Sequence, residues 1–360
     1  MPVIGAPEAP SSDYVDSIAD SRLWKRFDPR AGDIVIVTPP KSGTTWMQAI
    51  VAMLISANPE VRANISDNSP WVDALRDRFD AVMARLAVVT DRRHLKTHTP
   101  LDGIPFWADL QYVCVYRHPV DVYFSWRKHH SNMLADFNDM PAFDDPREGF
   151  RDYLERSFQG TAAPTLGSVI HHYKSAMEQR HRPNVLLVHY ADLSRNLAGE
   201  MARVARFLGV ILPPDVMEPL VAAAGFAKMK ARADRFAPNA GKGTWKSDEA
   251  FFDSATSRKW TGILAEDDLV AYRKLASEAL APEALAWLEW ESARPVMAKV
   301  RPFRRARGAG SRPRTRGRGG FAGTGPCDNR DVVFDRHVVS AGLWPEAGHR
   351  RGMHECSCRQ

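Results

Sequence analysis

Cysteine is scarce in this sequence, with four residues among 360. Only Cys114 lies in the part of the chain that reads as a folded body, inside an apolar run. The absence of a paired framework excludes a disulfide scaffold and favours a reducing compartment. Near the end of the chain, Cys356 and Cys358 could bind zinc together with His354, but no second pair accompanies them. We therefore predict a protein without a metal site.

Long hydrophobic runs are also missing. The longest apolar stretch worth testing, residues 47–57, is too short to span a bilayer and is interrupted by Gln48 and Ser56. The N-terminus has no basic segment followed by an apolar one, so no secretory signal is expected. These absences predict a cytoplasmic protein without integral membrane contact.

Positive charge is concentrated near the C-terminus. The net charge is +6, yet residues 301–320 contain eight arginines and no acidic residue. Removing these eight charges from +6 leaves −2, so the body is close to neutral and we expect no nucleic-acid partner. Residues 299–360 are rich in Arg, Gly and Pro, which predicts a disordered tail. A binder of RNA or anionic membrane acting through this tail remains an alternative.

The hydrophobic pattern alternates strands with helices. Strands are predicted at residues 33–38, 94–97, 111–116 and 185–189, where β-branched or apolar residues form short runs. Helices are predicted at residues 44–57, at residues 119–130, and up to Leu208 with Gly209 as the stop and Asp192 or Ser194 as the cap. Residues 134–165 have weak periodicity and predict a long excursion without regular structure. This order predicts an α/β fold with a central parallel sheet and helices on both faces.

The segment between the first strand and the first helix has the chemistry of an anion site. A helix N-terminus offers unpaired N–H groups, Gly43 permits close approach, and Lys41 adds a positive charge. A capped helix after a tight turn is the simpler alternative. A kinase-type P-loop needs a leading Gly and a Lys that follows the Gly, whereas Lys41 precedes Gly43. A P-loop kinase therefore stays a weaker alternative.

Three motifs carry a resemblance to a known family. Residues 40–46 (PKSGTTW), 96–100 (KTHTP) and 116–125 (YRHPVDVYFS) resemble the nucleotide and catalytic motifs of the cytosolic-type sulfotransferases. Residues 94–103 and 189–192 are similar to the bacterial, mycobacterial glycolipid sulfotransferase type. This likeness implies a P-loop-like nucleotide-binding sulfotransferase fold, with a lead-in at 1–30 and the domain at 31–298.

The resemblance also implies a donor and its binding residues. The donor would be 3′-phosphoadenosine 5′-phosphosulfate (PAPS), which becomes 3′,5′-bisphosphorylated adenosine (PAP) after transfer. By this likeness the residues that bind the 5′-phosphosulfate are Lys41, Ser42, Gly43, Thr44 and Thr45. Arg117 and Ser125 would bind the 3′-phosphate, while Trp46, Tyr190 and Phe226 would lie at the adenine.

His98 is the predicted general base. An acceptor hydroxyl must lose its proton to become a good nucleophile, and a histidine has a pKa suited to taking it. Negative charge builds on the oxygen between sulfate and phosphate, where the resemblance places Lys41, with Lys96 assisting. Residues 96 and 98 alternate with 97 on an extended strand and should face the same side. Lysine and arginine supply the positive charge, so no metal is expected.

The sequence departs from the family at two places. Asp253, Ser254 and Ala255 stand where Arg, Lys and Gly are usual beside the 3′-phosphate. Arg258 or Lys259 could compensate from another direction, and otherwise the donor should bind more weakly. Pro39 replaces a usual Tyr before the first motif.

The acceptor is not fixed by the motifs. A phenol, an alcohol or a glycolipid would each fit a pocket built from variable loops, for which residues 66–79 and 134–165 are the candidates. Aromatic residues that suggest an apolar acceptor are Trp71, Phe79, Phe106 and Trp107. We expect a small-molecule or lipid hydroxyl acceptor, and we also consider a homodimer.

Overall fold

A parallel sheet forms the centre of the described chain. The computed structural model describes residues 4–61, 63–134, 143–157 and 163–290. The strands are β1 (Ile34–Val37), β2 (His94–Thr97), β3 (Gln111–Tyr116) and β4 (Val185–His189). Their order is β2-β1-β3-β4, and each neighbouring pair is parallel. All four predicted strands are confirmed, with the first one residue shorter at each end.

The strands are buried on both faces because their side chains alternate between two cores. Ile34 and Ile36 of β1 belong to one hydrophobic cluster, while Val35 and Val37 belong to the other. Strands β3 and β4 divide their residues in the same way, whereas β2 contributes only Leu95 to a cluster. This alternation explains why the strands read as continuous apolar runs rather than as alternating polar and apolar residues.

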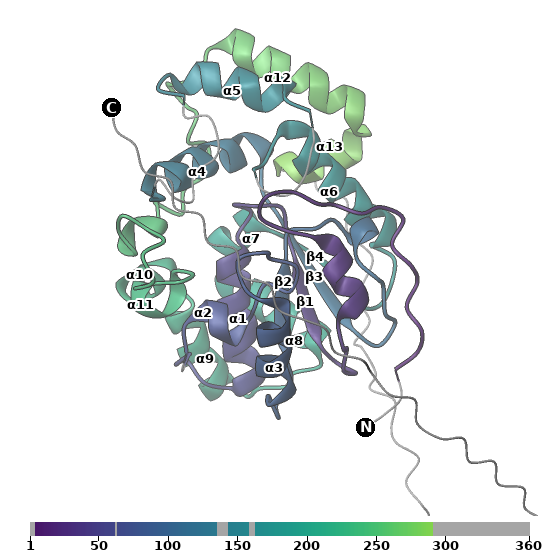
Figure 1. Cartoon of the computed structure of the whole chain (residues 1–360). Helices are drawn as coiled ribbons and strands as arrows, with labels where there is room; N and C mark the ends of the chain where they lie inside the picture. The colour runs from purple at the N-terminus through teal and green to yellow at the C-terminus, as the bar shows by residue number, and fades with distance from the viewer. Residues whose placement is uncertain (1–3, 62, 135–142, 158–162, 291–360) are drawn as a thin grey trace, which may run out of the picture. The chain divides into compact units, whose positions relative to one another are not determined.

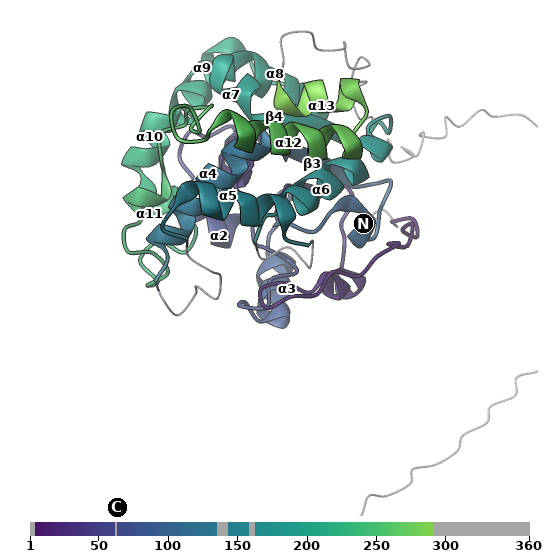
Figure 2. The same ribbon diagram turned by 90° about the horizontal axis from the view of Figure 1, so that it is seen from above.

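Helices cover both faces of the sheet, as predicted (Figure 1). The helices that contribute to the core with Ile34 are α1 (Thr44–Ser56), α7 (Tyr190–Arg195), α8 (Leu197–Leu208), α9 (Pro214–Ala223), α10 (Phe226–Ala231) and α11 (Ala233–Phe236). Those that contribute to the core with Val35 are α3 (Phe79–Ala87), α4 (Pro119–Asn132), α5 (Pro146–Glu155), α6 (Leu166–Gln179), α12 (Glu266–Ala279) and α13 (Pro282–Glu289). The short helix α2 (Ile65–Asn68) contacts α1, and α5 lies beside α12 (Figures 1 and 2).

Helix α5 corrects the prediction of an irregular excursion at residues 134–165. Asp145 caps the helix by accepting a hydrogen bond at 2.8 Å, and Pro146 occupies its first turn, where proline is favoured. Its buried side chains include Phe150 and Tyr153, one turn apart. The remaining positions are mostly charged or polar, which hid the helical period in the sequence.

The cap of α8 is a second correction. Asn196, not Asp192 or Ser194, accepts the first-turn hydrogen bond, at 3.0 Å. The segment before it is the separate helix α7, and the Asp192 carboxylate accepts a hydrogen bond from Trp290 Nε1 at 2.8 Å. Gly209, with φ of 69°, ends α8 as predicted.

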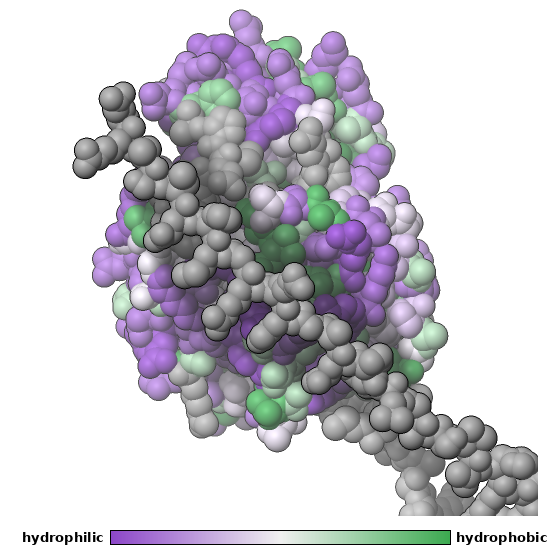
Figure 3. Space-filling model, viewed as in Figure 1, coloured by the Kyte–Doolittle hydropathy of each residue, from purple (hydrophilic) through white to green (hydrophobic). Residues whose placement is uncertain are grey.

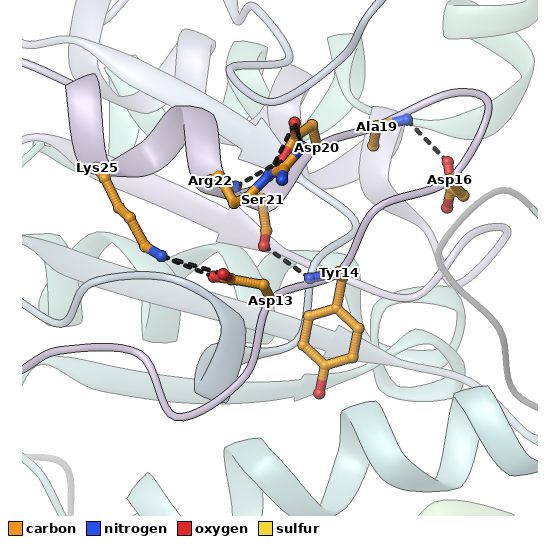
Figure 4. A network of polar contacts seen from close by, with 8 residues as sticks. All are labelled: Asp13, Tyr14, Asp16, Ala19, Asp20, Ser21, Arg22 and Lys25. Atoms are coloured by element: carbon orange, nitrogen blue, oxygen red, sulfur yellow. Dashed lines mark hydrogen bonds and ion pairs between the residues drawn. The ribbon is translucent and has the colours of Figure 1, made fainter.

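The N-terminal segment is held by local polar contacts (Figure 4). The backbone N–H of Tyr14 donates to Ser21 Oγ at 2.9 Å, and Lys25 pairs with Asp13 at 2.9 Å. The Tyr14 hydroxyl donates to the Asp102 carboxylate at 2.9 Å, which ties the segment to the domain. A 3₁₀ helix follows at residues 21–26.

Some predictions fall outside the described residues. The tail at 299–360 and the zinc candidate around His354 are among them. Within the described part, no helix is long and apolar enough to cross a membrane. The same residues contain no group of three His, Cys, Asp or Glu side chains placed to hold a metal ion. A metal-free site remains a prediction.

Candidate active site

The loop between β1 and α1 leads to a helix N-terminus that lacks a side-chain cap. Gly43 is the N-cap, with φ of 110° in the left-handed region. A Cβ atom at this position would lie 2.9 Å from Tyr190 Cδ2, so glycine is favoured by both conformation and space. The first-turn N–H groups of α1 therefore have no cap from this residue and can bind an anion.

Lys41 is a half-buried cation next to this helix end. Its Nζ lies 2.9 Å from His129 Nδ1 and 4.9 Å from the centroid of the Phe251 ring. Burial, followed by the positive charges of Arg117 and Lys259, lowers the pKa of Lys41 to about 7. A bound anion would offset these effects and favour the protonated amine.

Arg117 is a second cation, which is buried directly after β3 with 4% of its surface exposed. Its guanidinium lies 4.2 Å from the Tyr190 ring centroid, and one Nη donates to the Thr256 carbonyl at 2.8 Å. The Nε atom is buried and makes no hydrogen bond within the described chain. Arg117 therefore has donor capacity that a ligand could use.

A cavity of about 550 Å³ lies where the strands end. The predicted site residues that line it are Lys41, Gly43, Thr44, Thr45, Trp46, Lys96, His98, Arg117, Ser125, Tyr190 and Phe226. Ser42 is not part of the lining, and its buried hydroxyl makes no hydrogen bond to any residue that the structure describes. Figure 3 shows hydrophobic residues in a recess near the middle of the face seen in Figure 1. The chain thus brings together nearly all of the residues that the motifs indicated.

His98 is fixed in one tautomer by its backbone partner. Its Nδ1 lies 2.8 Å from the carbonyl oxygen of Thr38, and a carbonyl can only accept, so Nδ1 carries the proton. Burial and the nearby charge of Lys96 hold the pKa of His98 well below its usual value. The imidazole is therefore neutral, with an unprotonated Nε2.

Alternation along β2 and the residue that follows it places Lys96 and His98 in the cavity wall together. The intervening Thr97 hydroxyl instead donates to the buried Asp73 carboxylate at 2.8 Å. Lys96 Nζ lies 4.3 Å from the Trp71 ring centroid, and burial lowers the pKa of Lys96 to about 8. The two residues face the same side, as the extended strand predicts.

Aromatic rings form another wall of the cavity. Trp46 Nε1 donates to the Ala224 carbonyl at 2.8 Å, and the Trp46 ring meets Tyr190 edge-on with centroids 5.4 Å apart. Phe226 packs against Phe252 at 6.1 Å. These contacts hold flat apolar surfaces beside the loop and Arg117.

The late loop that departs from the family also reaches the cavity. Asp253, Ala255 and Lys259 line it, and the Asp253 carboxylate forms an ion pair with Lys259 Nζ. Of the two cations expected to compensate, Arg258 is not in the lining, and its backbone N–H donates to Asp121 at 3.1 Å. Lys259 is therefore the cation that lines the cavity, and Asp253 offsets part of its charge.

Several lining residues were missed from the sequence. They are Trp126, His129, Trp245, Phe251 and Asp77. They come from α4, from a 3₁₀ helix at Glu249–Phe251 and from loops, and although Asp77 lies within the 66–79 candidate segment, none was singled out as a site residue. Only their tertiary placement identifies them.

The expected acceptor aromatics need correction. Trp71 lines the cavity, but Phe79, Phe106 and Trp107 belong to the hydrophobic core. Phe106 stacks on Tyr112 with centroids 4.5 Å apart, for example. The loop before α3 does contribute several lining residues, whereas no described residue of the 134–165 segment does.

The structure is an α/β protein with a cavity, lined by Lys41, Lys96 and Arg117, at the carboxyl ends of its parallel strands. Residues 31–282 match the family model described as "Sulfotransferase domain". The chain is 33% identical over 303 residues to "Glycolipid sulfotransferase" of Mycobacterium bovis (strain BCG / Pasteur 1173P2), covering 76% of this chain and 93% of the relative. The chain belongs to the sulfotransferase family.

Other relatives and solved structures agree with this assignment. "Sulfotransferase 1E1" of Bos taurus is 26% identical over 235 residues, covering 61% of this chain and 76% of that protein. Mouse sulfotransferase SULT7A1 complexed with PAP has a TM-score of 0.60 at 17% identity, covering 79% of this chain and 98% of that one. Retinol dehydratase with androsterone and PAP has a TM-score of 0.58 at 20% identity, covering 73% and 87%. These likenesses support the fold.

Family membership settles the class of enzyme. The prediction of a PAPS-dependent sulfotransferase with an α/β fold is confirmed. The alternative of a P-loop kinase is not supported. The Arg-rich tail lies outside the described residues, so a separate binding activity of the tail stays untested.

Proposed function

We propose that the cavity binds PAPS between the 41–45 loop and Arg117. The observation that carries this proposal is a pair of cations in one cavity, the half-buried Lys41 and the buried Arg117, neither of them in an ion pair with a described carboxylate. Burying such charges is unfavourable unless a counter-ion accompanies them. PAPS carries a 3′-phosphate and a 5′-phosphosulfate on its ribose, which gives one anionic group for each cation. The residues present therefore fit the donor.

The remaining donor contacts follow from the cavity walls. We assign the 5′-phosphosulfate to the N–H groups and hydroxyls of residues 41–45, with Lys41 balancing the charge. Arg117 would bind the 3′-phosphate through its planar fork, with Ser125 adding a hydroxyl. The aromatic rings that we propose to lie against the adenine are those of Trp46, Tyr190 and Phe226, which line the same cavity.

His98 is proposed as the general base. PAPS supplies the sulfuryl group when it is bound. The neutral imidazole of His98 has its Nδ1–H tied to Thr38, so its Nε2 can take the proton of an acceptor hydroxyl. Lys41 and Lys96 provide positive charge on the same side of the cavity.

Asp253 should weaken donor binding, and its replacement should reverse the effect. We expect Asp253→Arg to tighten PAP binding by roughly three- to tenfold, since it removes the partner of Lys259 and adds a cation to a cavity wall. Isothermal titration calorimetry at low and high salt measures this, and the gain should shrink as salt screens the charges. Asp234→Arg is the matched control, with the same charge change at an exposed position outside the lining. An unchanged dissociation constant for Asp253→Arg would show that this loop does not contact the phosphate.

The acceptor is proposed to be the hydroxyl of a glycolipid rather than of a small phenol or alcohol. The cavity is lined by Trp71, Trp126 and Trp245, whose rings can pack against a sugar or an acyl chain, and the Trp71 ring contacts His98 with centroids 4.7 Å apart. The 33% identical mycobacterial relative carries the name glycolipid sulfotransferase, which supports the same class.

A transfer assay with radiolabelled PAPS tests this acceptor class. We expect label in glycolipid acceptors at a higher kcat/KM than in small phenols or alcohols. Trp71→Ala should raise the KM for the acceptor about three- to tenfold without changing PAP affinity, because it removes one aromatic wall. Transfer to a phenol alone would contradict the acceptor proposal, and a lack of both transfer and PAP affinity would contradict the donor proposal.

The cellular location and the oligomeric state of the protein are also proposals. We propose a cytoplasmic location, supported by the cysteine usage and by the free, buried thiol of Cys114. We also propose a homodimer, which light scattering on the purified chain would test directly.

A further inference from the structure

His129 occupies an unusual place beside the donor loop. It lies in the last turn of α4, lines the cavity, and its Nδ1 is 2.9 Å from Lys41 Nζ. Its ring is enclosed by Trp245 at 4.7 Å and Phe251 at 5.6 Å between centroids. Phe251 also contacts Lys41 Nζ through its ring face at 4.9 Å, so one aromatic side chain orders both partners.

The partner of Lys41 is a neutral acceptor rather than a carboxylate. Among the described residues Lys41 forms no salt bridge, and the nearby Asp253 pairs with Lys259 instead. A carboxylate in the place of His129 would neutralise the lysine and compete with an anionic donor. An imidazole nitrogen orients the ammonium and leaves its charge available, and two N–H donors remain for a ligand.

The proton of His129 can be assigned from this contact. An ammonium only donates, so Nδ1 accepts and Nε2 carries the proton. Burial and the cations Lys41 and Lys96 hold the pKa of His129 well below its usual value, with His98 and His130 acting in the same direction. His129 therefore stays neutral while Lys41 is charged. His98 has the opposite tautomer, with Nδ1 protonated.

We propose that His129 is a positioning residue that holds the Lys41 ammonium against the donor loop through its Nδ1 atom. This inference rests on the proposed binding of PAPS beside Lys41. Without the acceptor, Lys41 would lose its orientation, and its amine would be harder to protonate. The charged groups around Lys41 that also set its protonation are Arg117, Lys96, Lys259 and Asp253.

Two substitutions distinguish the role of the hydrogen-bond acceptor in His129 from the role of its flat ring. His129→Phe keeps a flat ring but removes the acceptor, and we expect kcat to fall roughly ten- to a hundredfold, the range for losing a hydrogen bond to a charged group. His129→Asn places an amide oxygen near the position of Nδ1 and should restore most of the loss. A merely structural role would make Asn at least as damaging as Phe.

The pH dependence of PAP binding gives a readout that does not require turnover. Lys41 binds an anion as the cation, and burial lowers its pKa to about 7, so PAP affinity should fall as the pH rises through 7. His129→Phe should move this fall to lower pH, because the ammonium loses an acceptor that stabilises it. His129→Asn should move it back.

A double-mutant cycle with Lys41→Met completes the test. If His129 acts through Lys41, His129→Phe should add almost nothing in the Lys41→Met background. Additive losses, or an unchanged pH profile in His129→Phe, would overturn the inference. Failure of the wild-type protein to bind PAP at any pH would instead contradict the donor proposal, so the two failures are distinguishable.

Discussion

His98→Ala should abolish sulfuryl transfer while PAP affinity stays close to that of the wild type. General-base catalysis contributes roughly 10²- to 10⁴-fold to a rate, and His98 offers the unprotonated Nε2 that this step needs. The His98 imidazole donates a hydrogen bond to the backbone carbonyl of Thr38, so its loss leaves the proposed nucleotide contacts at Lys41 and Arg117 in place.

Transfer and binding must be measured on the same preparations. A labelled-sulfate assay gives kcat/KM, and calorimetry gives the PAP dissociation constant. His181→Ala is the matched control, because His181 is exposed and lies outside the cavity lining. If His98→Ala kept most of the wild-type rate, His98 would have no part in proton removal.

Replacing Arg117 should separate binding from stability. We expect Arg117→Met to weaken PAP binding roughly ten- to a hundredfold, because hydrogen bonds from a guanidinium to a phosphate are lost. The same change should leave the melting temperature of the free protein unchanged or raised. A buried cation whose Nε has no partner costs free energy, and methionine removes that cost.

Arg93 provides a control of equal burial. It too is 4% exposed, but its guanidinium pairs with the buried Asp33, with Nε donating at 2.9 Å. Arg93→Met should lower the melting temperature, since it leaves a buried carboxylate unpaired, and it should leave PAP affinity unchanged. A loss of stability in Arg117→Met matching that of Arg93→Met would show that Arg117 is a structural residue.

The sheet could be predicted almost to the residue because its signal is local. Strands β1, β3 and β4 are short, mostly apolar runs buried on both faces, and β2, with the sequence HLKT, is closed by Pro100. Helix α5 was missed since only a few apolar side chains, such as Phe150 and Tyr153, face the core among charged neighbours. The cap of α8 was misplaced because Asp192 binds Trp290, a contact 98 residues away in the chain.

The residues of the candidate site also differ in whether the sequence alone could identify them. Residues that follow strands, such as His98 and Arg117, were predicted because their motifs are contiguous. His129 and Trp245 could not be, because their link to Lys41 and to each other exists only in three dimensions. Phe106 was assigned to the acceptor from its residue type alone, and stacking on Tyr112 places it in the core.

A crystal structure of the protein with PAP tests the central claim most directly. The account predicts the 5′-phosphate against the backbone of residues 41–45 with Lys41 in contact, the 3′-phosphate against Arg117, and His98 Nε2 open to the same cavity. A nucleotide bound elsewhere, or a phosphate that contacts neither cation, would contradict it.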